Sequence, residues 1–237
     1  MRPTGHHGAP FGFDCFDAGQ KIGRHVHGSA YAAIVLEGGY EEAGSAGRCR
    51  VAPGHVALHD AFDSHCNRFF RKNSRVFNLP LSRQYAISKW ARVRDPDAIV
   101  NAARVDSSKA EAILLSQLEP VLEPESDWPD LLCTAIRSGH RVSLTQWASR
   151  HGLARETLSR QFGAIFGIAP ATFRAEARAR RALREILSSG EPLSLVALRT
   201  GFADQAHMTR SVRALTGVTP SAWRRSHWFK TDDSRAA

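Results

Sequence analysis

The chain has 237 residues, 43% of them hydrophobic, which is enough for one large domain or two ordinary ones. No apolar run reaches the ~18 residues that a membrane span needs, and residues 1–19 lack the apolar stretch of a signal peptide, so we expect a cytoplasmic protein without a membrane partner. The net charge of +9 lies in the C-terminal part: residues 1–140 carry 16 basic and 16 acidic residues, whereas residues 141–237 carry 16 and 7. This asymmetry indicates a polyanion partner for the C-terminal part.

Residues 11–85 have the pattern of short β-strands. Apolar stretches at 30–36, 56–58 and 76–81 are separated by the Gly, Pro, Asn and Asp residues that are typical of turns. The cysteines show no CxxC spacing, so we interpret them as reduced thiols rather than a disulfide framework or a zinc site. They are Cys15, Cys49, Cys66 and Cys133.

Histidines gather in this part, because seven of the eleven fall within the first 65 residues. The pattern G-x5-H-x-H-x3-Y-x6-G runs from Gly19 through His25, His27 and Tyr31, and a weaker pattern, G-x5-D-x-F-x2-H, ends at His65. Over about residues 15–85 these patterns resemble the two motifs of the cupins, which are small β-barrels. Tyr31 stands where metal-binding cupins usually carry Glu. The resemblance implies a sensory barrel in which these three histidines and Tyr31 line a pocket for a small-molecule effector.

The same histidines are a candidate metal site. Residues two apart on a strand point to one face, so His25 and His27 should meet, and His65 should approach them from a neighbouring strand. Three histidines leave open positions on a divalent metal such as zinc, iron, nickel or copper. Because no acidic residue stands at the expected place, we favour a pocket without a cofactor. The alternatives are a metal-sensing regulator and a metal-dependent oxygenase joined to a DNA-binding domain, and further candidate ligands are His55, His59 and Cys66.

From Asp97 the apolar residues recur with a helical period as far as Leu118, and prolines then interrupt the pattern. We expect residues 97–140 to form a helical linker or dimerisation region. Its apolar faces serve either a homodimer interface or packing against the barrel.

The rest of the chain contains an internal repeat. The segment 147–153 corresponds to 196–202 at an offset of 49, and from Leu158, which matches Met208, the offset is 50 as far as Arg174 and Arg224. One residue is therefore inserted in the second turn. A repeat this regular indicates that one supersecondary unit occurs twice in the chain.

Each copy predicts a helix, a tight turn at a glycine and a second helix. The first copy has helices at 144–150 and 155–166 around Gly152, and we expect Leu158, Phe162 and Ile165 on the buried face of the second of these helices. The second copy turns at Gly201, and its second helix begins after the N-cap Asp204. This is the helix-turn-helix pattern, whose second helix enters the major groove. Between the copies, residues 170–189 predict a linker helix whose arginines either contact phosphates or are solvated.

The second copy resembles the signature of AraC/XylS-type transcriptional regulators, and the resemblance covers about residues 141–226. The matching residues are Val196, Ala197, Gly201, Phe202, Asp204, Met208, Thr209, Arg210, Gly217, Thr219, Pro220, Trp223 and Arg224. The family usually has Phe or Tyr where Met208 and Trp223 stand and an aromatic residue where Val212 stands, and these departures are core substitutions. Carried over position by position, the base-contacting sites of the first copy fall on Arg155, Glu156, Ser159 and Arg160. Those of the second copy fall on Gln205, Ala206, His207 and Arg210, with Thr209 on the same face. Ala206 offers only a methyl group.

The sequence thus predicts an α+β protein: a cupin-like barrel with helices, then an all-α domain of two helix-turn-helix units joined by a linker helix. The expected divisions are an effector-sensing domain at 1–96, the linker or dimerisation region at 97–140, the DNA-binding domain at 141–226 and a tail at 227–237. We expect a non-enzymatic regulator that binds double-stranded DNA and a small-molecule effector. RNA polymerase and a second copy of the chain are further partners that this interpretation allows.

Overall fold

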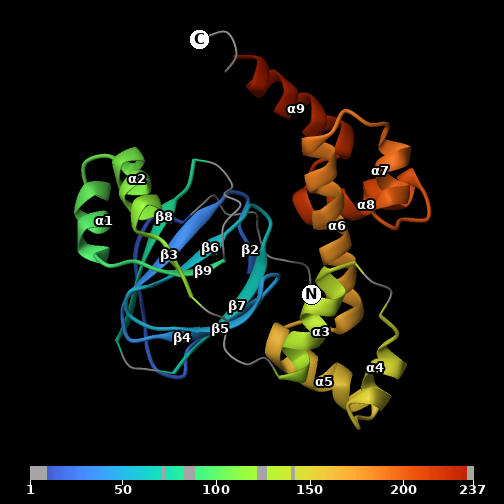
Figure 1. Ribbon diagram of the computed structural model, residues 1–237, viewed down its shortest axis with the longest axis horizontal. Helices are drawn as coiled ribbons and strands as arrows, with labels where there is room; N and C mark the ends of the chain where they lie inside the picture. The colour runs from blue at the N-terminus through green and yellow to red at the C-terminus, as the bar shows by residue number, and fades with distance from the viewer. Residues whose placement is uncertain (1–9, 71–72, 83–88, 122–126, 140–141, 234–237) are drawn as a thin grey trace. The chain divides into compact units, whose positions relative to one another are not determined.

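The computed structural model describes residues 10–70, 73–82, 89–121, 127–139 and 142–233 (Figure 1). Contacts divide the chain into two compact units, one formed by Met1–Thr134 with Leu144–Ala169 and the other by Ala135–Ser143 with Pro170–Ala237. The first unit therefore holds the sheets together with the first pair of helix-turn-helix helices. The predicted boundary at His140 and Arg141 lies outside the described residues, and the division at that point stays a prediction.

The strands of the described residues form two antiparallel sheets in the first unit. The larger has the order β1-β8-β3-β6-β9-β10, with bounds Gly12–Phe16, Ser74–Pro80, Tyr31–Glu37, His55–His59, Trp90–Arg92 and Glu119–Pro120. The smaller has the order β2-β7-β4-β5, with bounds Lys21–Val26, Ser64–Phe69, Tyr40–Gly44 and Gly47–Val51. The α+β class is confirmed, but the predicted barrel is not closed: among the described strands, no ladder of backbone hydrogen bonds joins the two sheets.

The apolar stretch predicted at residues 30–36 forms most of strand β3, and the packing of β3 explains why polar residues do not interrupt it. Alternate residues of a strand point to opposite faces, and here both faces are covered. Ala32 and Ile34 face a core that includes residues of α1 (Pro96–Ala103) and α2 (Ser107–Gln117). Tyr31, Ala33 and Val35 face the smaller sheet. The helices lie against the larger sheet in Figure 1, so the apolar face predicted for residues 97–118 packs on the sheet.

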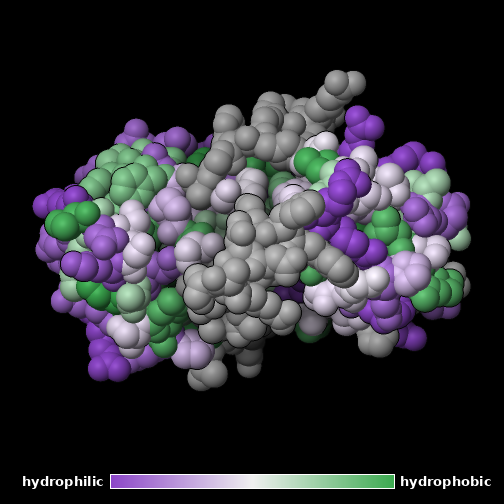
Figure 2. Space-filling view, turned by 90° about the horizontal axis from the view of Figure 1, so that it is seen from above, coloured by the Kyte–Doolittle hydropathy of each residue, from purple (hydrophilic) through white to green (hydrophobic). Residues whose placement is uncertain are grey.

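The remaining helices follow the predicted pattern closely. Their bounds are Trp128–Arg137 (α3), Leu144–Arg150 (α4), Arg155–Phe166 (α5), Pro170–Ser188 (α6), Leu193–Arg199 (α7), Gln205–Thr216 (α8) and Pro220–Asp233 (α9). One bound corrects the sequence prediction: the last helix runs to Asp233, past Arg225 and into the predicted tail. No helix in the described part of the chain is long and apolar enough to span a membrane. Hydrophilic residues are spread over the face shown in Figure 2, with smaller groups of hydrophobic residues among them.

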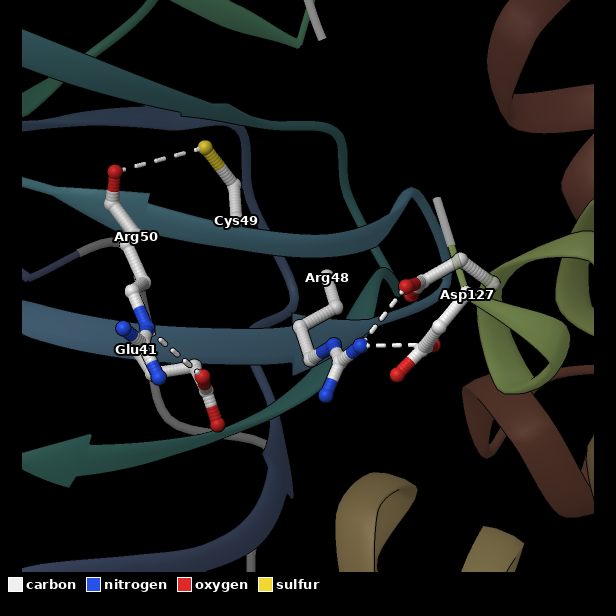
Figure 3. Close-up of polar contacts among 6 residues, drawn as sticks. Glu41, Arg48, Cys49, Arg50 and Asp127 are labelled. Atoms are coloured by element: carbon white, nitrogen blue, oxygen red, sulfur yellow. Dashed lines mark hydrogen bonds and ion pairs between the residues drawn. The ribbon is translucent and has the colours of Figure 1, made fainter. Parts of the chain in front are cut away.

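An arginine of the smaller sheet holds the start of α3. The Arg48 guanidinium on β5 donates from Nη2 to Asp127 Oδ1 at 2.7 Å and to Asp130 Oδ2 at 2.8 Å (Figure 3). Asp130 lies in the first turn of α3, and its side chain is only 13% exposed. Hydrogen bonds between charged groups of this kind are stronger than neutral ones, so they tie the start of α3 to the sheet.

Candidate nucleic-acid interface and candidate effector pocket

The two helix-turn-helix units share one backbone geometry. In the first, Leu153 N donates to Ala148 O at 2.9 Å, and in the second Phe202 N donates to Ala197 O at the same distance. The turn glycines, Gly152 and Gly201, have φ of 64° and 81°, a conformation that residues with a Cβ rarely adopt. The equivalent bonds confirm the repeat that the sequence predicts.

The second helices of the two units, α5 and α8, end alike but begin differently. Each ends on a left-handed glycine, Gly167 with φ 73° and Gly217 with φ 77°. Helix α8 begins at Asp204, whose Oδ1 accepts from His207 N at 2.6 Å, which confirms the predicted N-cap. Helix α5 begins at Ala154, which has no side chain able to cap. The first turn of α5 therefore lacks the side-chain cap that α8 has.

Helix α5 separates its core and solvent faces as predicted, with one change. Leu158 and Phe162 are buried, but the third core residue is Phe166, whereas the predicted Ile165 is half-buried. On the opposite face Ser159 is half-buried, and the remaining predicted base-contacting residues are exposed. They are Arg155, Glu156 and Arg160.

Helix α8 presents a comparable face. Gln205, Ala206 and Arg210 are exposed, and Thr209 is half-buried. His207 is half-buried too, since its ring meets the Phe202 ring edge-on at 5.1 Å between centroids. Three of these five predicted residues are thus exposed, and the other two are half-buried, of which His207 also packs against the turn.

Most arginines of α6 have partners within their own unit. Arg174 donates to Val142 O at 2.7 Å and Arg181 to Thr200 O at 2.9 Å, and Arg178 stacks over the Phe202 ring. Arg180 pairs with Glu176. Of the alternatives left open by the sequence, phosphate contact therefore fits best the exposed Arg184.

The predicted effector residues meet between the two sheets. His25 on β2 is paired in register with His65 on β7, and their rings lie 4.2 Å apart between centroids. The His27 ring lies 5.0 Å from that of His25 and 4.9 Å from that of Tyr31. The Tyr31 hydroxyl is 3.1 Å from His65 Nε2. These four side chains line one cavity of about 240 Å³.

Two further cavity residues were not among the predicted site residues. Glu42 on β4 is buried, and its Oε2 lies 3.5 Å from Nε2 of the buried His59 on β6. The sequence pattern makes His59 only a further candidate ligand and does not point to Glu42, because it places the acidic ligand at position 31. The signal was present: Glu42 is two residues from Tyr40 on one strand, so both point inward.

Burial decides the charge state of these groups. Burial raises the pKa of Glu42 to about 8, against a hydrogen bond from Asn67 that lowers it. Burial also lowers the pKa of His59 to about 3 and that of His65 well below its usual value. Removal from water disfavours the charged form of each group. Both shifts in pKa favour the uncharged forms, so burial weakens any ion pair between Glu42 and His59.

The strands that carry the pocket histidines also contact α5. Arg24 precedes His25 on β2, and its Nη1 donates to Phe166 O at 2.9 Å. Cys66 follows His65 on β7, and its thiol donates to Ile165 O at 3.3 Å. Neighbouring strand residues point to opposite faces. The same two strands thus bear the pocket on one side and hold the last turn of α5 on the other.

Part of the chain is similar in sequence to known proteins. Residues 147–226 match the family described as a helix-turn-helix domain. Over 78 residues the chain is 30% identical to the HTH-type transcriptional regulator ExsA of Pseudomonas aeruginosa, covering 33% of this chain and 28% of ExsA. It is 31% identical over 78 residues to the virulence regulon transcriptional activator VirF of Yersinia enterocolitica, covering 33% of this chain and 29% of VirF. The chain thus spans less than a third of the length of these relatives. Among solved structures, the DNA-binding domain of AdpA in complex with a target DNA has a TM-score of 0.41 at 24% identity, covering 44% of this chain and 96% of that chain.

Proposed function

We propose that this chain, whose residues 147–226 form an AraC-type helix-turn-helix domain, is a cytoplasmic transcriptional regulator that binds double-stranded DNA through α5 and α8. The observation that carries the proposal is the pair of equivalent units, each with an exposed polar face on its second helix. Arginine suits guanine O6 and N7, and glutamine suits adenine N6 and N7. Relatives that match 78 residues of the chain are named as a transcriptional regulator and a transcriptional activator.

The test uses the full chain and genomic fragments of the organism that encodes it, selected for binding and then sequenced. Arg160→Ala and Arg210→Ala should each relax preference in one half of the selected site, at a cost of ~1–3 kcal/mol for a lost base contact. Arg50→Ala is the matched control, since Arg50 is an exposed arginine of the sheets. Equal affinity for selected and random fragments would refute the proposal. A uniform loss with a smaller salt slope would reassign the mutated arginine to phosphate contact.

We infer further that the cavity between the sheets is an effector site that alters the binding of DNA. Support comes from β2 and β7, which carry His25 and His65 toward the cavity and Arg24 and Cys66 toward the end of α5. A ligand shifts an equilibrium only when it binds one state better than the other. A ligand in the cavity would contact the same strands that contact α5, so its binding can favour one arrangement of α5 over another.

Replacing Arg24 and Cys66 together by Ala tests this link. Hydrogen exchange in the last turn of α5 should quicken, and the affinity of the full chain for its selected DNA should change. Arg68→Ala is the control, since Arg68 is an exposed residue on β7. Unchanged exchange and unchanged affinity in the double variant would remove the link and leave the DNA-binding proposal intact. A homodimer and contact with RNA polymerase stay predictions from the sequence.

A further inference from the structure

The cavity contains two groups of side chains able to hold a metal ion, and the groups share one member. His25, His27 and His65 form the first group, and Glu42, His59 and His65 form the second. Within each group the candidate ligand atoms all lie within 4.8 Å of one another. The first group is the one that the histidine spacing predicts. The second exists only in the folded chain, because its members come from β4, β6 and β7.

The second group is the more completely removed from water. Glu42, His59 and His65 are 3%, 5% and 4% exposed, whereas His25 and His27 are only half-buried. Two of its nitrogens are buried without a hydrogen bond in the described part of the chain, His59 Nε2 and His65 Nδ1. A buried polar atom left without a hydrogen-bond partner destabilises the folded state. Two such nitrogens beside the buried Glu42 side chain favour a bound partner in this group.

Tyr31 prepares the shared histidine. Its hydroxyl lies 3.1 Å from His65 Nε2, which leaves Nδ1 as the nitrogen without a partner. A hydrogen bond at one ring nitrogen orients the imidazole and determines which nitrogen is free for a metal. The Tyr31 phenol can thus hold the His65 ring in the orientation that a metal ligand needs. The carboxylate comes from Glu42, eleven residues later in the chain.

We propose that Glu42, His59 and His65 bind one divalent transition-metal ion of the zinc type. Neutral imidazole nitrogens and one carboxylate are ligands that such ions accept, and three protein ligands leave a position open for a small molecule. The cation would balance the buried carboxylate, to which Asn67 Nδ2 also donates at 3.3 Å. His25 and His27 lie beside His65, where they can contact a molecule at the open position. The metal site is inferred from these contacts alone. Only the role of the ion as an effector of DNA binding rests on the proposed function.

Co²⁺ is the probe, because its visible absorption reports a bound, ordered ligand set. Full-length protein without an affinity tag, freed of metal and with His6 and His7 replaced by Ala, should bind about one equivalent of Co²⁺. Glu42→Gln and His59→Gln should each weaken this binding at least tenfold. The controls Glu41→Gln and His55→Ala change neighbouring residues on β4 and β6 that lie outside the group, and they should bind as the parent does.

Several outcomes would overturn the proposal. Absence of stoichiometric Co²⁺ binding would do so, and so would binding that survives in Glu42→Gln and His59→Gln but is lost in His25→Ala and His27→Ala. Thermal unfolding with and without Zn²⁺ guards against misfolded variants: the parent should gain stability and Glu42→Gln should gain none. DNA binding is measured on the same samples. Loss of the metal result with DNA binding retained therefore refutes the metal site alone.

Discussion

Helices α5 and α8 differ in their N-caps, so substitutions at the two equivalent cap positions should change helix opening in opposite directions. Asp204 supplies one charged hydrogen bond, 2.6 Å to His207 N, at the start of α8. Removing such a cap costs ~1 kcal/mol, so Asp204→Ala should raise the opening of the first turn of α8 about fivefold. Ala154 occupies the corresponding place before α5 and has extended backbone angles, φ −70° and ψ 144°. Ala154→Asp should therefore gain a cap and slow the opening of the first turn of α5 by a similar factor.

Amide hydrogen exchange of the full chain, resolved by peptide, measures both changes, since exchange reports local opening. Asp204→Asn retains the acceptor oxygen and should restore most of the protection in α8. The two helices serve as controls for each other, because each substitution should leave exchange in the other helix unchanged. Slower exchange of α8 in Asp204→Ala, or no gain of protection in Ala154→Asp, would show that the two positions are not equivalent and that the repeat does not extend to the caps.

Three further outcomes are expected. Burial raises the pKa of Glu42 from 4.5 to about 8, so between these pH values the folded chain binds more protons than the unfolded chain. The contribution of Glu42 to the stability of the folded chain therefore falls as the pH rises through this range. With a chelator present, Glu42→Gln should match the parent near pH ~4 and exceed its stability near pH ~9, by at most about 5 kcal/mol; parallel pH profiles in denaturant unfolding would contradict this. Gly167→Ala should destabilise more than Gly152→Ala. Both glycines are left-handed, but a Cβ at Gly167 meets Arg24 Cβ at 3.1 Å, whereas one at Gly152 meets open space; equal losses would mean that β2 does not contact the end of α5. Phe162→Ala should cost ~3–5 kcal/mol, since the ring is fully buried, and a loss below ~1 kcal/mol would show that the site collapses or is solvated.

The sequence alone determined the helical part in detail. The bounds of α4 and α5 and the cap at Asp204 agree with the prediction, because apolar periodicity, turn glycines and caps act over a few residues. The repeat strengthened each local inference, since one copy checked the other. Two errors arose at the ends of local patterns, at Ile165 and at the end of α9.

Only the tertiary structure decided what the strands bring together. Spacing along one strand placed His25 and His27 on one face, and a neighbouring strand brought His65 to them, but nothing in the order of residues joins Glu42 to His59. Pairing between distant strands depends on the packing of both sheets, which no short pattern encodes. The same holds for the contact of Arg24 with the end of α5, 142 residues away in the chain. The chemistry of the cavity is therefore a property of the fold, because side chains from separate strands lose their water together only when the sheets pack.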